Sequence, residues 1–206
     1  MDADWEAQGS IELGFDARPM VPLYAKISGS VVRSWGTRSA EALDEALTRV
    51  DLETLQRRVE ESEEFSALVG RAMQAAGDSL LQDKRRLLGR LIAEATLDDA
   101  LIDDNIIWVD ILASIDAPHV RCMEAVRRAE QEAAASGEQE PVAEASEKPY
   151  VRRIQDAANG YPSPIIRTLS NLGLIQGTVN WDESSRVTGM TRHGERLLSY
   201  LREGNS

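Results

Sequence analysis

The chain has 206 residues, of which 42% are hydrophobic and 28% are charged, a balance typical of a protein with a buried core. Its single cysteine, Cys122, excludes an internal disulfide and a thiolate-rich metal site, and its longest apolar stretch, residues 106–115, is too short to cross a membrane. The acidic start is unlike a secretory signal, so we expect a cytoplasmic protein with no membrane-spanning segment.

Charge is distributed unevenly along the chain. Residues 1–149 carry 16 Lys and Arg against 30 Asp and Glu, a net charge of −14. Residues 150–206 carry 7 Arg against 5 Asp and Glu, a net charge of +2. Because acidic surfaces repel phosphate, only the C-terminal quarter is expected to approach a nucleic acid.

Residues 1–130 are expected to form an acidic α-helical domain whose first ~20 residues are loose. Aromatic residues are scarce, and apolar residues recur at three- and four-residue intervals, as in a helical bundle. The predicted helices begin near Pro22, Ser39, Asp51, Ser62, Ser79, Asn105 and Asp116. Gly36 is expected to end the first helix, and Gly77 is expected to close the fourth in a left-handed conformation.

Residues 131–148 differ in composition from the rest of the chain. They contain five Ala, five Glu, one Pro and one Gly, with Val142 as the one larger apolar residue. Such a segment cannot offset the entropy of ordering, so we expect it to be disordered. It is either a linker between two domains or a long internal loop, because a winged helix needs a preceding helix and the nearest candidate is 117–130.

Residues 149–206 change periodicity in a defined order. The predicted elements are helices over 150–159 and 163–172, strands over 174–181 and 186–190, and a last helix after Thr191. Gly173 is expected to end the second of these helices. The order helix, helix, hairpin, helix is typical of a winged helix-turn-helix. The expected fold is therefore mainly α, a helical bundle followed by a winged helix-turn-helix with a two-stranded wing.

Two short motifs carry a resemblance to known proteins. Residues 167–175 read RTLSNLGLI, and residues 187–201 read VTGMTRHGERLLSYL. This pair resembles the close of bacterial winged-helix domains of the MarR and PadR kind, with Met190 in place of the usual leucine. The resemblance implies a winged-helix fold over about residues 150–203. The stretch from KRRLLGRLIAE to DAPHVRCME, residues 84–124, also resembles uncharacterised actinobacterial proteins with a helical N-terminal half and a winged-helix ending, which implies no activity.

Common catalytic motifs are absent from the sequence. It contains no G-x-G-x-x-G, G-x-x-x-x-G-K-[ST], H-E-x-x-H or G-x-S-x-G, so we expect no enzymatic activity and no cofactor. His119 and Cys122 would make half of a zinc site, but no further ligands complete it, and we interpret them as a helix-surface histidine and an inert thiol. Four acids without the spacing of a calcium loop are interpreted as a solvated connection: Asp98, Asp99, Asp103 and Asp104.

The acidic half contains one basic cluster and one tryptophan of interest. The cluster consists of Lys84, Arg85, Arg86 and Arg90. We expect it to be a solvated helix face on which Arg90 can pair with Glu94, four residues later. Trp108 is predicted to lie in the core, and Trp181 is predicted to pack under the wing.

The helix over residues 163–172 is the candidate recognition helix. Its apolar residues at 165, 166, 169 and 172 are expected to face inward, which leaves the polar residues between them, Ser170 included, more exposed. Arg and Asn match guanine and adenine edges, and a serine near a helix start can hold a phosphate. The candidate DNA-binding residues are Arg152, Arg153, Ser163, Arg167, Thr168, Asn171, Arg186 and Arg192.

Two functional hypotheses follow. The first is a non-enzymatic transcriptional regulator that binds duplex DNA through residues 150–192 as a homodimer, because a single module with few cations binds weakly and two half-sites add. The alternative is an interaction or scaffold protein whose winged helix binds a protein partner. Asp182 and Glu183, at the predicted wing tip, favour the alternative, since a minor-groove contact there needs a cation.

Overall fold

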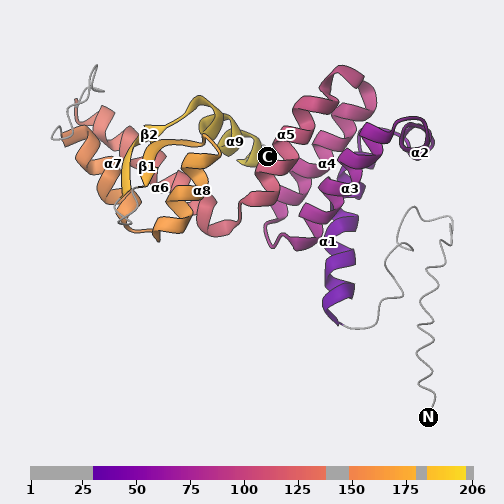
Figure 1. Ribbon diagram of the computed structural model, residues 1–206, viewed down its shortest axis with the longest axis horizontal. Coiled ribbons are helices and arrows are strands. Elements are labelled where there is room, and N and C mark those ends of the chain that lie inside the picture. Colours follow the sequence, from indigo (N-terminus) through magenta and orange to yellow (C-terminus); the bar gives the residue numbers. More distant parts are fainter. Residues whose placement is uncertain (1–29, 138–148, 180–184, 203–206) are drawn as a thin grey trace, which may run out of the picture.

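The computed structural model describes residues 30–137, 149–179 and 185–202. In chain order the elements are α1 (Ser30–Leu47), α2 (Leu52–Glu61), α3 (Glu63–Asp78), α4 (Gln82–Leu97), the 3-10 helix η1 (Asp99–Leu101), α5 (Ile102–Ser114), α6 (Ala117–Ala135), α7 (Pro149–Asn159), α8 (Ser163–Asn171), β1 (Ile175–Val179), β2 (Ser185–Met190) and α9 (Arg192–Arg202). The prediction of a mainly helical fold is confirmed. Figure 1 shows α1 to α5 gathered in one group and α6 to α9 with the two strands in another.

The first group is a bundle in which α4 is the central helix, packed against α1, α3 and α5. Two predicted helix starts are confirmed by their caps. The Asp51 carboxylate accepts the Thr54 N–H at 2.8 Å, and the Ser62 hydroxyl accepts the Phe65 N–H at 3.1 Å. Each cap satisfies an N–H that has no partner within its own helix.

The predicted boundary between the first two helices is wrong. α1 continues through Gly36 and Ser39 instead of ending at one and restarting at the other. A glycine inside a helix costs only about 1 kcal/mol, which tertiary packing can outweigh. Ser39 is buried, and its hydroxyl donates to the Met73 carbonyl oxygen at 2.9 Å. The helix start predicted at Pro22 lies outside the described residues.

Gly77 also has a different role from the predicted one. It lies inside α3 and does not adopt a left-handed conformation. A Cβ atom at this position would lie 2.2 Å from the indole ring of Trp35, so the glycine allows α1 to approach α3 closely. The Trp35 Nε1–H donates to the Asp78 carboxylate at 3.1 Å.

α6 corrects the predicted start of the disordered segment. The helix continues to Ala135, so residues 131–135 are helical, and Ala133 is buried. Alanine and glutamate favour a helix, and packing stabilises the extra turn. Residues 138–148 of that segment lie outside the described residues. Because α6 packs against α7, α8, α9 and β2, the elements before and after the segment belong to one packed group.

The predicted hairpin is present. β1 and β2 pair antiparallel, from Ile175 opposite Met190 to Val179 opposite Ser185, with a register shift at Gln176 and Gly177. Gly173 follows the end of α8, as predicted, and it adopts a left-handed conformation with a φ of 65°. The predicted turn between the strands lies outside the described residues.

Side chains from two helices cover the outer edge of β2. The Gln155 side chain on α7 donates to the Ser185 carbonyl oxygen at 2.8 Å and accepts the Val187 N–H at 2.6 Å. The Glu130 carboxylate on α6 accepts the Met190 N–H at 2.6 Å. An edge strand exposes unpaired backbone groups, and these contacts satisfy three of them. They also fix the hairpin against α6 and α7.

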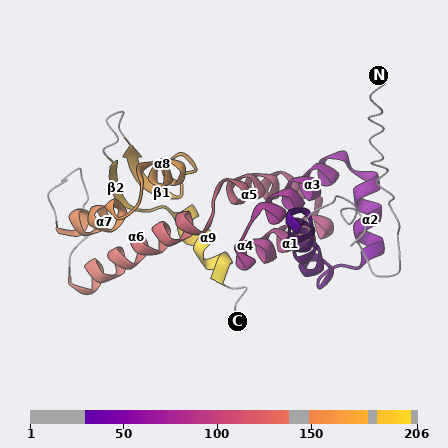
Figure 2. The same ribbon diagram turned by 90° about the horizontal axis from the view of Figure 1, so that it is seen from below.

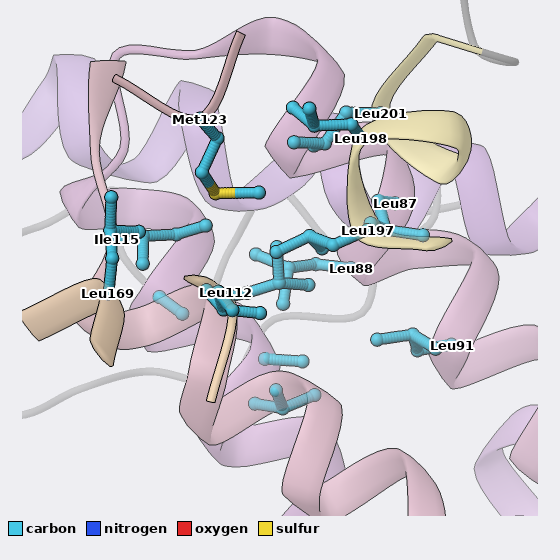
Figure 3. Packing of buried hydrophobic residues seen from close by; sticks show 14 of the residues in the cluster. Leu87, Leu88, Leu91, Leu112, Ile115, Met123, Leu169, Leu197, Leu198 and Leu201 are labelled. Carbon is cyan, nitrogen blue, oxygen red and sulfur yellow. The ribbon is translucent and has the colours of Figure 1, made fainter. Parts of the chain in front are cut away.

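α9 joins the two groups of helices. Its inner face is buried, as predicted, and consists of Gly194, Leu197, Leu198 and Leu201. Figure 3 shows these leucines in one buried cluster with leucines of α4 and α5, Met123 of α6 and Leu169 of α8. Figure 2 shows α9 between α6 and α4, and both helices contact it. The hydrophobic core is therefore continuous from the bundle to the hairpin.

Candidate nucleic-acid interface

The outer face of α8 is polar because its apolar residues are used by the core. Ile166 and Leu169 are almost completely buried, whereas Arg167 and Asn171 are exposed and Thr168 is half-buried. Residues 167 and 171 are four apart and lie on the same side of the helix. α8 therefore presents a guanidinium, a hydroxyl and an amide along one stripe.

Two serines of α8 are half-buried and do not belong to that stripe. Ser170, predicted to be more exposed, is half-buried, and its hydroxyl donates to the Gly177 carbonyl oxygen of β1 at 2.5 Å. Ser163 begins the helix and is half-buried. The prediction that Ser170 is more exposed used only the spacing of apolar residues within the helix. That spacing contains no information about β1, which packs beside the helix and supplies the acceptor.

Three further candidate residues are exposed arginines on other elements of the same group: Arg152 on α7, Arg186 on β2 and Arg192 at the start of α9. Arg153, also on α7, is half-buried and has an interaction partner. In the described part of the chain, none of Arg152, Arg167, Arg186 and Arg192 forms an ion pair. Their charges are therefore available to a ligand.

Hydrogen bonds hold the ends of α8 and α9 together. The Thr191 hydroxyl donates to the Gly173 carbonyl oxygen at 2.6 Å, and the Thr191 N–H donates to the Leu174 carbonyl oxygen at 3.2 Å. The start of α9, with Arg192, is thus beside the end of α8, with Asn171. Gln155 places α7 along β2, and β1, the partner strand of β2, packs against α8. The exposed candidate arginines beyond α8 therefore lie on three elements of the same packed group, α7, β2 and α9.

The basic cluster of α4 is not the solvated face that its sequence predicts. Lys84, Arg85 and Arg90 are all more than nine-tenths buried. The Lys84 ammonium donates to the Ile115 carbonyl oxygen at 2.7 Å, and burial lowers the pKa of this lysine. Arg85 Nε donates to the Glu41 carboxylate at 2.6 Å.

The third of these residues, Arg90, also differs from its prediction. Instead of pairing with Glu94, its guanidinium donates to the Tyr200 carbonyl oxygen of α9 at 2.9 Å. That carbonyl belongs to the last turn of α9, where a cation is favourable. The signal available in the sequence was the apolar run 87–88 and 91–93, which is too wide for one helix face.

An aromatic group lies where α5 meets α9. Trp108, predicted as a core residue, is half-buried; its ring centroid is 6.3 Å from that of Tyr200 and 6.3 Å from that of His193. The Arg196 guanidinium lies 5.7 Å from the Trp108 ring centroid and 5.1 Å from the Tyr200 ring centroid. These contacts attach α9 to the bundle. Trp181 lies outside the described residues.

His119 and Cys122 have structural roles in α6. His119 Nδ1 accepts the Asp116 N–H at 3.1 Å, and burial lowers the pKa of the imidazole. Cys122 is fully buried, which raises the pKa of its thiol to about 11. Thiolate is the metal-binding form, so this burial opposes metal binding. No group of three His, Cys, Asp or Glu side chains suited to a metal occurs among the described residues.

The acids between α4 and α5 also contribute to structure. The Asp98 carboxylate accepts the Ala100 N–H at 3.0 Å and caps η1, and Asp99 forms an ion pair with Arg58 of α2. Asp103 and Asp104 are exposed in the first turn of α5, where negative charge is favourable.

None of the described helices is both long enough and apolar enough to cross a membrane. Comparison with protein-family models, with curated proteins and with solved structures gave no match. The function must therefore be inferred from the geometry and charge of the site.

Proposed function

We propose that α6 to α9 form a winged helix, with α8 as its recognition helix and the β1–β2 hairpin as its wing, and that this unit binds duplex DNA. The order of the elements supports this, because three helices are followed by an antiparallel hairpin. The packing of α6 against both α7 and α8 also supports it, since α6 supplies the helix that a winged helix needs before its helix-turn-helix.

The observation that carries the proposal is the polar stripe on α8, in which Arg167 and Asn171 are exposed and Thr168 is half-buried, together with exposed arginines without ion pairs on α7, β2 and α9. An arginine can form a bidentate contact with guanine, and an asparagine can do so with adenine. Arg152, Arg186 and Arg192 are suited to phosphate contacts that set orientation rather than sequence. The bundle, with its acidic surface, would face away from the duplex.

The proposal includes a dimer because the net positive charge of the C-terminal residues is small. Residues 150–206 carry a net charge of only +2, so one copy would bind DNA weakly. Two copies that engage two half-sites would add their contacts, and the helical half would hold them together. The resulting function is that of a transcriptional regulator without enzymatic activity.

The test is binding of the full-length protein to random-sequence duplex DNA over a series of salt concentrations. We expect binding that weakens as salt rises, with Arg152→Ala reducing the slope of log affinity against log salt by about 1 per lost phosphate contact. Arg167→Ala should cost about 1–3 kcal/mol at a selected site and relax its sequence preference. Arg49→Ala, which removes an exposed arginine of the bundle, is the matched control.

Absence of binding at low salt would contradict the proposal, because sequence-specific proteins retain a nonspecific electrostatic affinity for DNA. The same stripe on α8 would then be a surface for a protein partner. An unchanged affinity in Arg167→Ala, with wild-type binding intact, would instead show that the protein binds DNA through another face.

A further inference from the structure

Two helices of the group formed by α6 to α9 end in an exposed asparagine. The two asparagines differ in the residue that follows them. Asn159 ends α7 and is followed by Gly160, whereas Asn171 ends α8 and is followed by Leu172. Asn159 is the one asparagine of the chain that precedes a glycine. Asn171 is thus an internal control for the reactivity of the Asn159 side-chain amide.

The backbone N–H after each asparagine is held differently. The Leu172 N–H donates to the Thr168 carbonyl oxygen at 3.0 Å, which keeps it within the helical turn. The Gly160 N–H makes no backbone hydrogen bond in the described part of the chain, and Gly160 is exposed. With no Cβ at position 160, its nitrogen is also less hindered.

The carbonyl oxygen of the Asn159 side chain accepts a hydrogen bond. Gln155 Nε2 donates to Asn159 Oδ1 at 2.7 Å. The orientation of the Gln155 amide is fixed, because its Oε1 accepts the Val187 N–H and its Nε2 also donates to the Ser185 carbonyl oxygen. A donor on this oxygen stabilises negative charge that develops there when a nucleophile adds to the carbon.

We infer that Asn159–Gly160 is a site of spontaneous deamidation in the folded protein. The Gly160 nitrogen bonds to Cγ of Asn159, the bond from Cγ to Nδ2 breaks, and ammonia leaves with the proton of the Gly160 amide. Water then opens the cyclic imide and yields aspartate or isoaspartate at position 159. The net reaction consumes one water, releases one ammonia and involves no oxidation or reduction.

The modification adds one negative charge at the turn between α7 and α8. This charge lies at the C-terminal end of α7, where the helix dipole disfavours it, and it lowers the small positive charge of residues 150–206. The consequence for DNA rests on the proposed function: the modified form binds DNA more weakly. The chemical inference itself does not depend on DNA binding.

The test is incubation of the full-length protein at mildly alkaline pH under native conditions, followed by peptide mass mapping of positions 159 and 171 over time. Conversion is expected at 159 and not at 171. Gly160→Ala should slow conversion about tenfold, because a methyl group hinders the nitrogen. This variant is suited to the test, since the added Cβ would meet only the Ala157 carbonyl oxygen at 3.5 Å, an ordinary contact.

The inference would be overturned if the side-chain amides at 159 and 171 persisted equally in the native protein. It would also be overturned if residue 159 were converted only in the presence of a denaturant. DNA affinity is measured separately on fresh wild type, aged wild type and aged Gly160→Ala. If fresh wild type does not bind DNA, the proposed function fails while the mass data still decide the deamidation.

Discussion

The basic residues of α4 and the arginines of α7 to α9 differ in exposure. Their comparison shows that basic residues clustered in the sequence need not form a charged surface. Lys84, Arg85 and Arg90 lie within seven residues of one another, yet each is buried and donates to a carbonyl or carboxylate oxygen. The candidate arginines of α7 to α9 are spread over 41 positions of the sequence, between Arg152 and Arg192, and four of them are exposed.

The difference follows from the position of each helix in the fold. α4 is surrounded by α1, α3, α5 and α9, so even its polar side chains lie between helices and must find acceptors there. α8 packs against β1 and α6, and the residues at 164, 167 and 171 remain exposed to solvent. Charge that is buried with partners supports the fold, and charge that remains exposed is available for binding.

The largest effect should come from breaking a buried contact of α4. Arg85→Ala removes the Glu41 ion pair and leaves the buried Ser79 carbonyl oxygen without the Arg85 donor 3.0 Å away. We expect a loss of about 2–3 kcal/mol in the free energy of unfolding, measured in urea. Arg152→Ala is the comparison, since this exposed arginine should change stability by less than about 0.5 kcal/mol. Equal effects of the two substitutions would refute the distinction between structural and available charge.

A smaller effect is expected at the contact between α4 and α9. Arg90→Met removes the hydrogen bond to the Tyr200 carbonyl oxygen but also removes a buried Nε–H that has no partner among the described residues. These changes partly cancel, so we expect a loss of about 1 kcal/mol in urea unfolding. A stabilised variant would show that the unpaired Nε–H outweighs the hydrogen bond. Arg86→Met, on the same helix, is a less buried comparison.

The smallest effect is a pH dependence from His119. Burial lowers the pKa of this imidazole below its usual 6.5, so between its folded and unfolded pKa values the unfolded chain binds more protons. Stability should therefore fall as the pH decreases below 6.5, because protonation also removes the acceptor for the Asp116 N–H. His119→Gln, which retains an acceptor without titrating, should flatten this part of a curve of unfolding free energy against pH. An unchanged slope would assign the pH dependence to other groups.

Local patterns in the sequence predicted much of the C-terminal group. The leucine spacing of α9, the helix end at Gly173 and the short antiparallel hairpin are set by interactions within a few residues, and all three are present. The caps at Asp51 and Ser62 are local in the same sense. The polar residues at 167, 168 and 171 also followed from the spacing of the apolar residues around them.

Features that depend on distant segments could not be predicted in this way. Gly36 looked like a helix end, but α1 continues through it. Gly77 lies one residue before the end of α3 without the predicted left-handed conformation, and its missing Cβ lets Trp35 of α1 approach. Ser170 turned inward because β1 offers it an acceptor. α6 continued into the Ala- and Glu-rich segment, where Ala133 is buried.

The sequence by itself determined the helical class, the hairpin and the stripe on α8, because periodicity and capping are properties of neighbouring residues. Only the tertiary structure decided which charges are buried and how the two groups of helices are joined. Burial depends on how many elements surround a helix, and those elements are up to 110 residues away along the chain, as Arg90 and Tyr200 are. A short window of sequence therefore cannot identify such partners.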